Sequence, residues 1–218
     1  TKQYMPGDVV VDVVSTQRNL TAKVDGGDFH LNTSMEGGVQ QLTKSFSAIA
    51  KTIGKQLENK YIDQTAILRL LPRGYIQLQT GRTNFFSELL ANRGYQFAHA
   101  DINMVSSPDN GLDGVIKIDS LVYDKVRMDQ VNVEVKSTDG KMGYKAWIAN
   151  NAANDYPYTA FLDGTLYEHG IKTHAAVLDT KGRVGIDVGL QVAMADQGLR
   201  FNITSTNAII GYKPFKVN

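Results

Sequence analysis

Residues 183–195 read Arg-Val-Gly-Ile-Asp-Val-Gly-Leu-Gln-Val-Ala-Met-Ala, and this stretch decides the fold class. Every second residue from position 184 to position 194 is apolar, and the residues between them are small or polar. Because successive strand side chains point to opposite faces, the pattern predicts a long strand with one apolar face. The predicted apolar row is Val184, Ile186, Val188, Leu190, Val192 and Met194. Such a row must be covered by something other than water.

The same alternation recurs in the second half of the chain. It predicts strands around residues 131–135, 142–148, 171–177 and 199–203. Six more apolar residues then share the face of the first row: Val131, Val133, Val135, Leu199, Phe201 and Ile203. The intervening segments 138–141, 179–182 and 196–198 carry the Asp and Gly residues of tight turns, so neighbouring strands are expected to be antiparallel.

The first half of the chain has a different organisation. Strands are predicted at residues 9–14, 20–24 and 29–31, and apolar residues then recur at spacings of three and four between positions 39 and 57. That period predicts an amphipathic helix, with Phe46, Ile49 and Ile53 on its apolar side. A second, shorter helix is predicted at residues 84–92, with Asn84 as its N-cap and Gly94 near its C-terminus. Residues 66–71 and 75–79 are predicted to be strands on either side of a Pro-Arg-Gly turn.

These elements predict an α+β fold that is mainly antiparallel β. Residues 1–94 supply strands and two helices, and residues 95–218 supply a meander, as parts of the same domain. Two helices are too few to cover one face of a sheet of about ten strands. The sheet could pack on itself as a sandwich, close into a barrel, or curl into an open trough lined by its apolar face. The strand pattern leaves these three alternatives open.

The composition argues against several functional classes. The 23 Lys and Arg residues are balanced by 22 Asp and Glu residues, so the net charge of +1 gives no electrostatic basis for binding nucleic acid. The absence of cysteine excludes disulfides and thiol chemistry. No window approaches the roughly 18 consecutive apolar residues of a membrane-spanning helix. Since the chain opens on Thr-Lys-Gln, we expect an internal segment of a longer polypeptide.

No metal site is predicted from the histidines. Of the four, only His169 and His174 are close in sequence, and a separation of five residues places them on opposite faces of a strand. We therefore interpret His30, His99 and this pair as surface or strand-edge residues.

No catalytic set is predicted either. Asp155, Asp163 and Glu168 lie near the Tyr-Pro-Tyr turn at residues 156–158 and are interpreted as a solvated loop rather than a glycosidase carboxylate pair. The chain lacks a Gly-x-Ser-x-Gly elbow, and the glycines of residues 182–189 lack the dinucleotide-binding spacing. We expect no enzymatic activity and no cofactor.

One alternative function rests on aromatic residues. Five of them are near one another in sequence: Tyr144, Trp147, Tyr156, Tyr158 and Phe161. Exposed and coplanar, they would suit the stacking platform of a secreted or surface β-sandwich carbohydrate-binding module. A core or rim role for Trp147 is an equally good interpretation.

Several segments resemble the TamB (translocation and assembly module) proteins of Bacteroidota envelopes. The resemblance lies in residues 162–166, in the strand at 183–195, in residues 199–203, and in the closing Ile-Ile-Gly-Tyr-Lys-Pro-Phe-Lys-Val-Asn at 209–218. Upstream, Gly-Gly-Asp-Phe-His-Leu at 26–31, the long helix and Leu-Gln-Thr-Gly-Arg-Thr-Asn at 78–84 follow the order of an internal region of those proteins. The resemblance covers essentially the whole chain and consists of hydrophobic spacing and turn residues.

The resemblance implies a β-groove of the AsmA-like kind, in which strands curl into a trough with an apolar interior. It implies a non-enzymatic, periplasm-spanning segment of a protein anchored in the inner membrane. Such a segment would shield phospholipid acyl chains in transport to the outer membrane, or assist outer-membrane protein assembly with an Omp85-type partner. The long helix is interpreted, independently of the resemblance, as core packing for its own sheet; the functional alternative is that it caps one end of the groove and gates entry. Bare edge strands of the excised segment are expected to self-associate.

Overall fold

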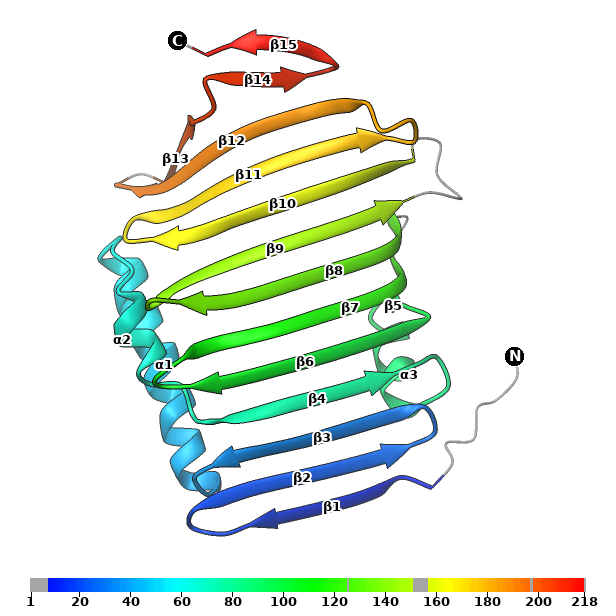
Figure 1. The fold of residues 1–218 in the computed structure, drawn as a ribbon. Coiled ribbons are helices and arrows are strands. Elements are labelled where there is room, and N and C mark those ends of the chain that lie inside the picture. Colours follow the sequence, from blue (N-terminus) through cyan, green and yellow to red (C-terminus); the bar gives the residue numbers. More distant parts are fainter. Residues whose placement is uncertain (1–7, 125, 151–156, 197, 218) are drawn as a thin grey trace.

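The computed structural model describes residues 8–124, 126–150, 157–196 and 198–217. These residues form one antiparallel sheet of fifteen strands with three helices (Figure 1). The predicted predominance of antiparallel β structure is therefore confirmed. The strands of the first half are β1 (Val10–Ser15), β2 (Asn19–Gly26), β3 (Phe29–Glu36), β4 (Gly74–Thr80), β5 (Tyr95–Gln96), β6 (His99–Ser107) and β7 (Gly111–Tyr123).

The second half consists of strands alone in the part of the chain that the structure describes. These strands are β8 (Val126–Thr138), β9 (Lys141–Asn150), β10 (Tyr158–Tyr167), β11 (Gly170–Asp179), β12 (Val184–Ala195), β13 (Gly198–Ile203), β14 (Asn207–Ile210) and β15 (Lys213–Lys216). The helices, all from the first half, are α1 (Val39–Glu58), α2 (Gln64–Leu68) and α3 (Phe85–Ala91).

The strands follow one another across the sheet almost in chain order. The order is β1-β2-β3-β4-β6-β7-β8-β9-β10-β11-β12-β14-β15, with β5 beside β7 and β13 beside β12. The β4–β6 ladder crosses position 94, so the two predicted parts of the chain share one continuous sheet. Among the described residues β1 and β15 do not pair with each other, so the sheet is not closed.

Tight turns produce this meander. Between β8 and β9, Asp139 and Gly140 have φ values of 52° and 72°, which is the left-handed pair that a two-residue type I′ hairpin requires. Such a turn matches the twist of the flanking strands, so each strand pairs with the next one.

Helix α1 runs along one row of strand ends, on the left in Figure 1. At its start, Gly37 N–H donates to Arg18 O at 2.7 Å, in the β1–β2 turn. Beyond its end, Ile62 N–H donates to Glu168 O at 2.6 Å in the β10–β11 turn, and Lys60 pairs with Asp196 at 2.6 Å. A helix of 20 residues is about 30 Å long, which matches roughly six strand spacings. Both ends of α1 are thus fixed to the sheet; we call this side of the sheet the α1 end.

Residues 66–71 are not a strand, and this prediction was wrong. The chain forms helix α2 here, because the Asp63 carboxylate accepts from Ala66 N–H at 2.9 Å and caps the first turn. A short apolar run fits a helix as well as a strand, and Leu68 is buried in this arrangement. Gln64 then ties α2 to the sheet, since its side-chain oxygen accepts from Met142 N–H at 2.7 Å.

Helix α3 lies at the opposite row of strand ends, beside β5 (Figure 1). Its N-cap is Asn84, as predicted, and Ser87 completes a capping box. The ring centroids of Phe85 and Phe86 lie 5.0 and 5.5 Å from that of Phe29 on β3. This aromatic contact places α3 against one corner of the sheet. We call the side of the sheet that includes this corner the α3 end.

Very little of the molecule is buried. A compact monomer of 24.0 kDa would expose about 10,000 Å², whereas this chain exposes 14331 Å². In the described part of the chain, the buried apolar side chains are Phe29, Leu42, Leu68, Phe97, Ala100, Ala149 and Ala208. The strands therefore form a sheet without the sealed core of an ordinary sandwich or barrel.

Candidate functional site: an apolar sheet face and the pocket at its corner

The register of the ladders gathers the apolar side chains on one face. In an antiparallel sheet, directly paired residues point to the same side. One unbroken series of such pairs crosses eleven strands from β1 to β12, and we call it the central row. It consists of Val11, Val24, Leu31, Leu78, Ile102, Ile116, Val133, Ala146, Leu162, Ala175 and Val188. At about 4.8 Å per strand, this row is about 48 Å long.

We call the side that carries the central row the apolar face. The opposite side is polar over most of its length. The row next to the central row there begins with Val10 on β1 and continues with Asp25, His30, Gln79, Asp101, Lys117 and Asn132. Along these two rows, from β2 to β8, apolar side chains therefore lie on one side of the sheet and polar side chains on the other.

Most of the predicted lining residues lie on the apolar face. Val131, Val133 and Val135 of β8 share that face with Ile186, Val188, Leu190, Val192 and Met194 of β12, through the intervening strands. The last three of these pair directly with β13, in the order Ile203, Phe201 and Leu199. The register thus places residues as many as 72 positions apart on the same face.

Val184 differs from the prediction. The β11–β12 register shifts by one residue, so Val177 faces Ile186 while Leu178 faces Val184. Because Val177 and Leu178 point to opposite sides, Val184 does not continue the row on the apolar face. The irregularity lies at Gly185, whose missing side chain leaves room for the Tyr212 ring.

None of these lining residues is buried. Ile186 is 39% exposed and Phe201 is 65% exposed, and the β8 valines are half-buried. For comparison, the largest fully buried side chains of the described residues, at 1% exposure, are the polar Asn84 and Thr80. The apolar face is therefore open over much of its area.

The α1 helix adds a second open apolar stripe. Leu42 is buried and Ile49 is half-buried, whereas Phe46 is 49% exposed and Ile53 is 38% exposed. Phe46 and Ile53 are seven residues apart and so lie on one side of the helix. The helix is tied down at its ends, but the apolar side of its middle is only partly covered.

A polar cluster holds the loop between β4 and α3. Asp28, in the β2–β3 turn, accepts from Thr83 N–H at 3.1 Å and from Asn84 Nδ2 at 2.5 Å. Asn84 also donates to Thr80 Oγ1 at 3.0 Å and to Gly81 O at 3.1 Å. A side chain at Gly81 would run into the Asp28 carboxylate. The segment is therefore fixed at four of the five positions from 80 to 84.

The charge state of Asp28 follows from the same contacts. Burial alone would raise the pKa of this carboxyl, but the hydrogen bonds from Asn84 and Thr83 outweigh it and hold the pKa below its usual value. Asp28 is thus a carboxylate at neutral pH, and the loop is built around its negative charge.

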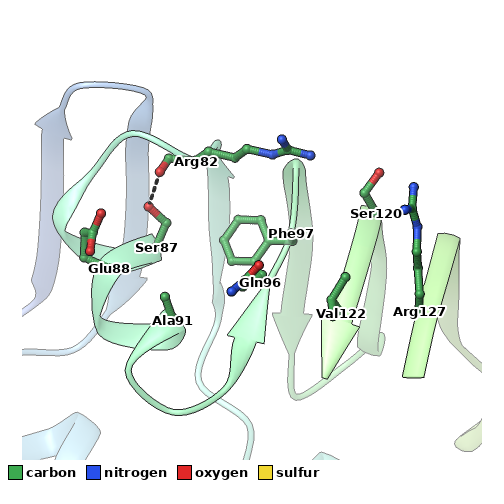
Figure 2. A pocket seen from close by; sticks show the side chains of 9 residues that line it. All are labelled: Arg82, Ser87, Glu88, Ala91, Gln96, Phe97, Ser120, Val122 and Arg127. Carbon is green, nitrogen blue, oxygen red and sulfur yellow. Dashed lines mark hydrogen bonds between the residues drawn. The ribbon is translucent and has the colours of Figure 1, made fainter. Parts of the chain in front are cut away.

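A pocket of about 320 Å³ lies between α3 and the adjoining strands (Figure 2). Its lining comes from five segments: Arg82 of the β4–α3 loop, Ser87, Glu88 and Ala91 of α3, Gln96 of β5 with Phe97 after it, Ser120 and Val122 of β7, and Arg127 of β8. Val122 of the lining pairs directly with Arg127, and α3 packs against Phe29, which lies two residues from Leu31 on β3, so the pocket lies at the α3 corner of the apolar face.

Two guanidinium groups border this pocket. Figure 2 shows the Arg82 side chain extending toward Ser120, with the Arg127 guanidinium at the same rim and the Phe97 ring below. Arg127 Nε lies 3.3 Å from Asp129 Oδ1. Nothing in the sequence pattern pointed to this pair, because Arg82 and Arg127 are 45 positions apart and belong to different elements.

The predicted aromatic platform is divided between the two faces. Trp147 and Phe161 pair with each other on the polar face, whereas Tyr144 and Tyr158 lie on the apolar face. Tyr156 and Asp155 lie outside the described residues. A shallow depression on the polar face is lined by Trp147, Phe161 and their neighbours.

Charged groups on the polar face contact one another around His174. His174 Nε2 lies 2.9 Å from Asp187, and its Nδ1 lies 3.4 Å from Asp163. The hydrogen bond with Asp187 is the main reason that the pKa of His174 is raised. His169 belongs to the β10–β11 turn, with Nδ1 3.1 Å from Lys60 O. In the described residues no three His, Asp or Glu side chains gather as a metal site.

Across the described ranges, no helix has the length and apolar character needed to traverse a bilayer. No family model, no curated protein and no solved structure matches this chain.

Proposed function

We propose that the sheet curls into a trough and that its apolar face shields the acyl chains of lipids from water. The proposal rests above all on one observation: the central row is apolar in all eleven strands, and the face that carries it is not sealed. A soluble protein that leaves such a face open would expose far more apolar surface than a monomer normally tolerates. A bound apolar ligand removes that cost.

The energetics favour an acyl chain as the occupant. Each exposed CH₂ costs about 0.8 kcal/mol, so a chain of about sixteen carbons costs roughly 13 kcal/mol in water. Branched aliphatic side chains in an unbroken row contact such a chain without directional bonds. The row would therefore hold a lipid tail at any position along its length, as a conduit requires.

The cellular setting follows from the sequence resemblance alone and is part of the proposal. A segment of the TamB and AsmA-like kind would be one section of a periplasmic bridge, in a protein anchored in the inner membrane. Lipid transport to the outer membrane and assembly of outer-membrane proteins with an Omp85-type partner are the two processes that such a section would serve. The chain acts by binding and needs no cofactor or catalytic group.

In this proposal, α1 is the cap of the trough. Its ends are tied to the turns of β1–β2 and β10–β11, and its exposed stripe of Phe46 and Ile53 provides apolar surface at the α1 end. A lipid tail entering there would slide between this stripe and the sheet.

The test is binding of cis-parinaric acid, a fluorescent fatty acid, to paired variants of β8. Val133→Asp places a charge in the central row, and Asn132→Asp places the same charge one residue away on the polar face. We expect Val133→Asp to weaken binding at least tenfold and Asn132→Asp to leave it unchanged. Equal affinities for both variants and the wild type, with all three folded by circular dichroism, would contradict the proposal.

A second candidate function is carbohydrate binding on the polar face. It is favoured by the pairing of Trp147 with Phe161 in a depression bordered by Lys145 and Asp163. Titration with oligosaccharides, followed by Trp147 fluorescence, separates the two candidates, since this is the chain's single tryptophan. A saturable change that Phe161→Ala abolishes would support a carbohydrate module.

A further inference from the structure

We propose that the corner pocket binds the headgroup of a zwitterionic phospholipid, through its phosphate and its ammonium group, while the acyl chains lie on the apolar face. This inference rests on the proposed function, because it assumes that tails occupy that face. It adds a polar site to a surface that otherwise recognises only apolar chains.

The position of the pocket suits an amphipathic ligand. Val122 and Arg127 of its wall pair directly with each other, and α3, which supplies the opposite wall, packs on Phe29 of the apolar face. A molecule with its polar end between Arg82 and Arg127 therefore has apolar surface directly adjoining. The buried Phe97 ring forms an apolar wall, where a glycerol backbone would pass from one region to the other.

The donors in the pocket fit a phosphate. A guanidinium presents five N–H groups in a planar fork, so Arg127 can hold Asp129 and still contact a phosphate oxygen. Charge-assisted bonds of this kind are stronger than bonds between neutral groups. The Ser120 hydroxyl and the Gln96 amide lie in the same lining and can donate to further oxygens.

The balance of charges in the pocket favours a headgroup that carries one negatively and one positively charged group. Arg82 and Arg127 are balanced by the Glu88 carboxylate of the lining and by Asp129 on Arg127. A neutral set of this kind does not favour a dianion, but it complements one phosphate and one ammonium. Glu88 comes from α3, on the other side of the pocket from β8, and would accept the ammonium group (Figure 2).

The site is held in place before a ligand arrives. On one side of Arg82, the Gly81 N–H donates to Asp28 O at 3.1 Å. On the other side, the Thr83 N–H donates a hydrogen bond to the Asp28 carboxylate. The carbonyl of Arg82 itself accepts from Ser87 Oγ at 2.8 Å. The backbone of Arg82 is therefore fixed on both sides, which lowers the entropy lost when the side chain binds.

The experiment is native mass spectrometry of the 218-residue chain with three probes. Dioleoyl phosphatidylethanolamine carries head and tails, oleic acid carries only a tail, and glycerophosphoethanolamine carries only the head. We expect the lipid to bind at least tenfold more tightly than oleic acid, and the tail-free head not to bind at the same concentration. Arg82→Gln should reduce the preference for the lipid over oleic acid about tenfold.

Two further variants sharpen the test. Arg93→Gln removes an exposed arginine that follows α3 and is outside the pocket lining, so it should change nothing. Glu88→Gln should shift the preference from phosphatidylethanolamine toward phosphatidylglycerol, which lacks the ammonium.

The possible failures are distinct. If oleic acid binds as well as the lipid and Arg82→Gln has no effect, the headgroup site is wrong and the acyl-binding face stands. If glycerophosphoethanolamine binds as tightly as the lipid, the pocket serves a soluble phosphate compound and the inference is overturned. If neither oleic acid nor the lipid binds, the proposed function itself fails.

Discussion

The Asn84 side chain makes five hydrogen bonds that join α3 to the loop before it and to the β2–β3 turn. It caps α3, donates to the Asp28 carboxylate, and is only 1% exposed. We expect Asn84→Ala to lower the free energy of unfolding by about 2 kcal/mol, since a cap and a buried hydrogen bond are lost together. Urea denaturation measures this change.

A second variant distinguishes the two roles of Asn84. Asn84→Asp keeps the capping oxygen but sets a second carboxylate against Asp28, so it should destabilise the protein as well. If Asn84→Asp were as stable as the wild type, capping alone would explain the role of Asn84.

The low pKa of Asp28 also determines how the stability of the protein changes with pH. Its stabilisation is complete above its unfolded pKa near 4 and is lost as pH falls through the folded pKa.

His174 gives the opposite pH dependence. Its pKa in the folded chain is raised above 6.5 by Asp187 and Asp163, so its pairs stabilise the protein fully below pH 6.5. That contribution is lost as pH rises through the folded pKa. We therefore expect the urea midpoint of the wild type, relative to that of His174→Gln, to fall as the pH rises above about 6.5. Parallel pH profiles for the two proteins would contradict this assignment.

At the scale of elements, α1 offers the clearest prediction. Its apolar stripe is only partly covered, so Phe46→Ala with Ile53→Ala should leave the fold intact while opening the α1 end. We expect faster uptake of cis-parinaric acid in stopped-flow fluorescence, about threefold or more. Lys44→Ala with Lys51→Ala, on exposed positions of the same helix, is the matched control. Unchanged uptake in the Phe46 and Ile53 variant would count against a capping role.

Alternation of apolar and polar residues predicted most strands, because the period of two is imposed locally by the pleat. Helix α1 was likewise predicted from apolar residues spaced three and four positions apart. Strands β6, β7 and β10 were not predicted. Two further errors came where a local pattern was ambiguous or interrupted. Residues 66–71 fit either period, and the shift at Gly185 that displaces Val184 has no signature in the alternation.

The pocket could not be predicted from the sequence at all. Arg82 and Arg127 come together only because β4, β6, β7 and β8 are neighbours in the sheet, and because Asp28 fixes the intervening loop. Such contacts depend on strand order, which short sequence patterns do not encode. Asn84 was visible as a helix cap, but its partner Asp28 is 56 positions away.

At the scale of the whole molecule, the two edges of the sheet are unequal. Edge strand β1 is exposed along its length and rich in valine, whereas β15 carries Pro214 between lysines. Proline and lysine on an edge hinder pairing with another strand, and valine does not. We expect concentration-dependent self-association through β1 in analytical ultracentrifugation.

Val11→Lys should suppress that self-association, because it places a charge in the central row at the free edge. Phe215→Lys, on the edge that is already protected, should change it little. If self-association survives Val11→Lys but disappears with Phe215→Lys, the contact is made by β15, and the prediction of pairing through β1 is contradicted.

The central claim is that the apolar face holds acyl chains. Photo-crosslinking in intact cells tests it most directly, with benzoylphenylalanine at Val188 in the central row and at Gln191 on the polar face of the same strand. The account predicts lipid adducts from position 188 and none from position 191. Lipid adducts at equal yield from both positions, or from neither, would contradict it.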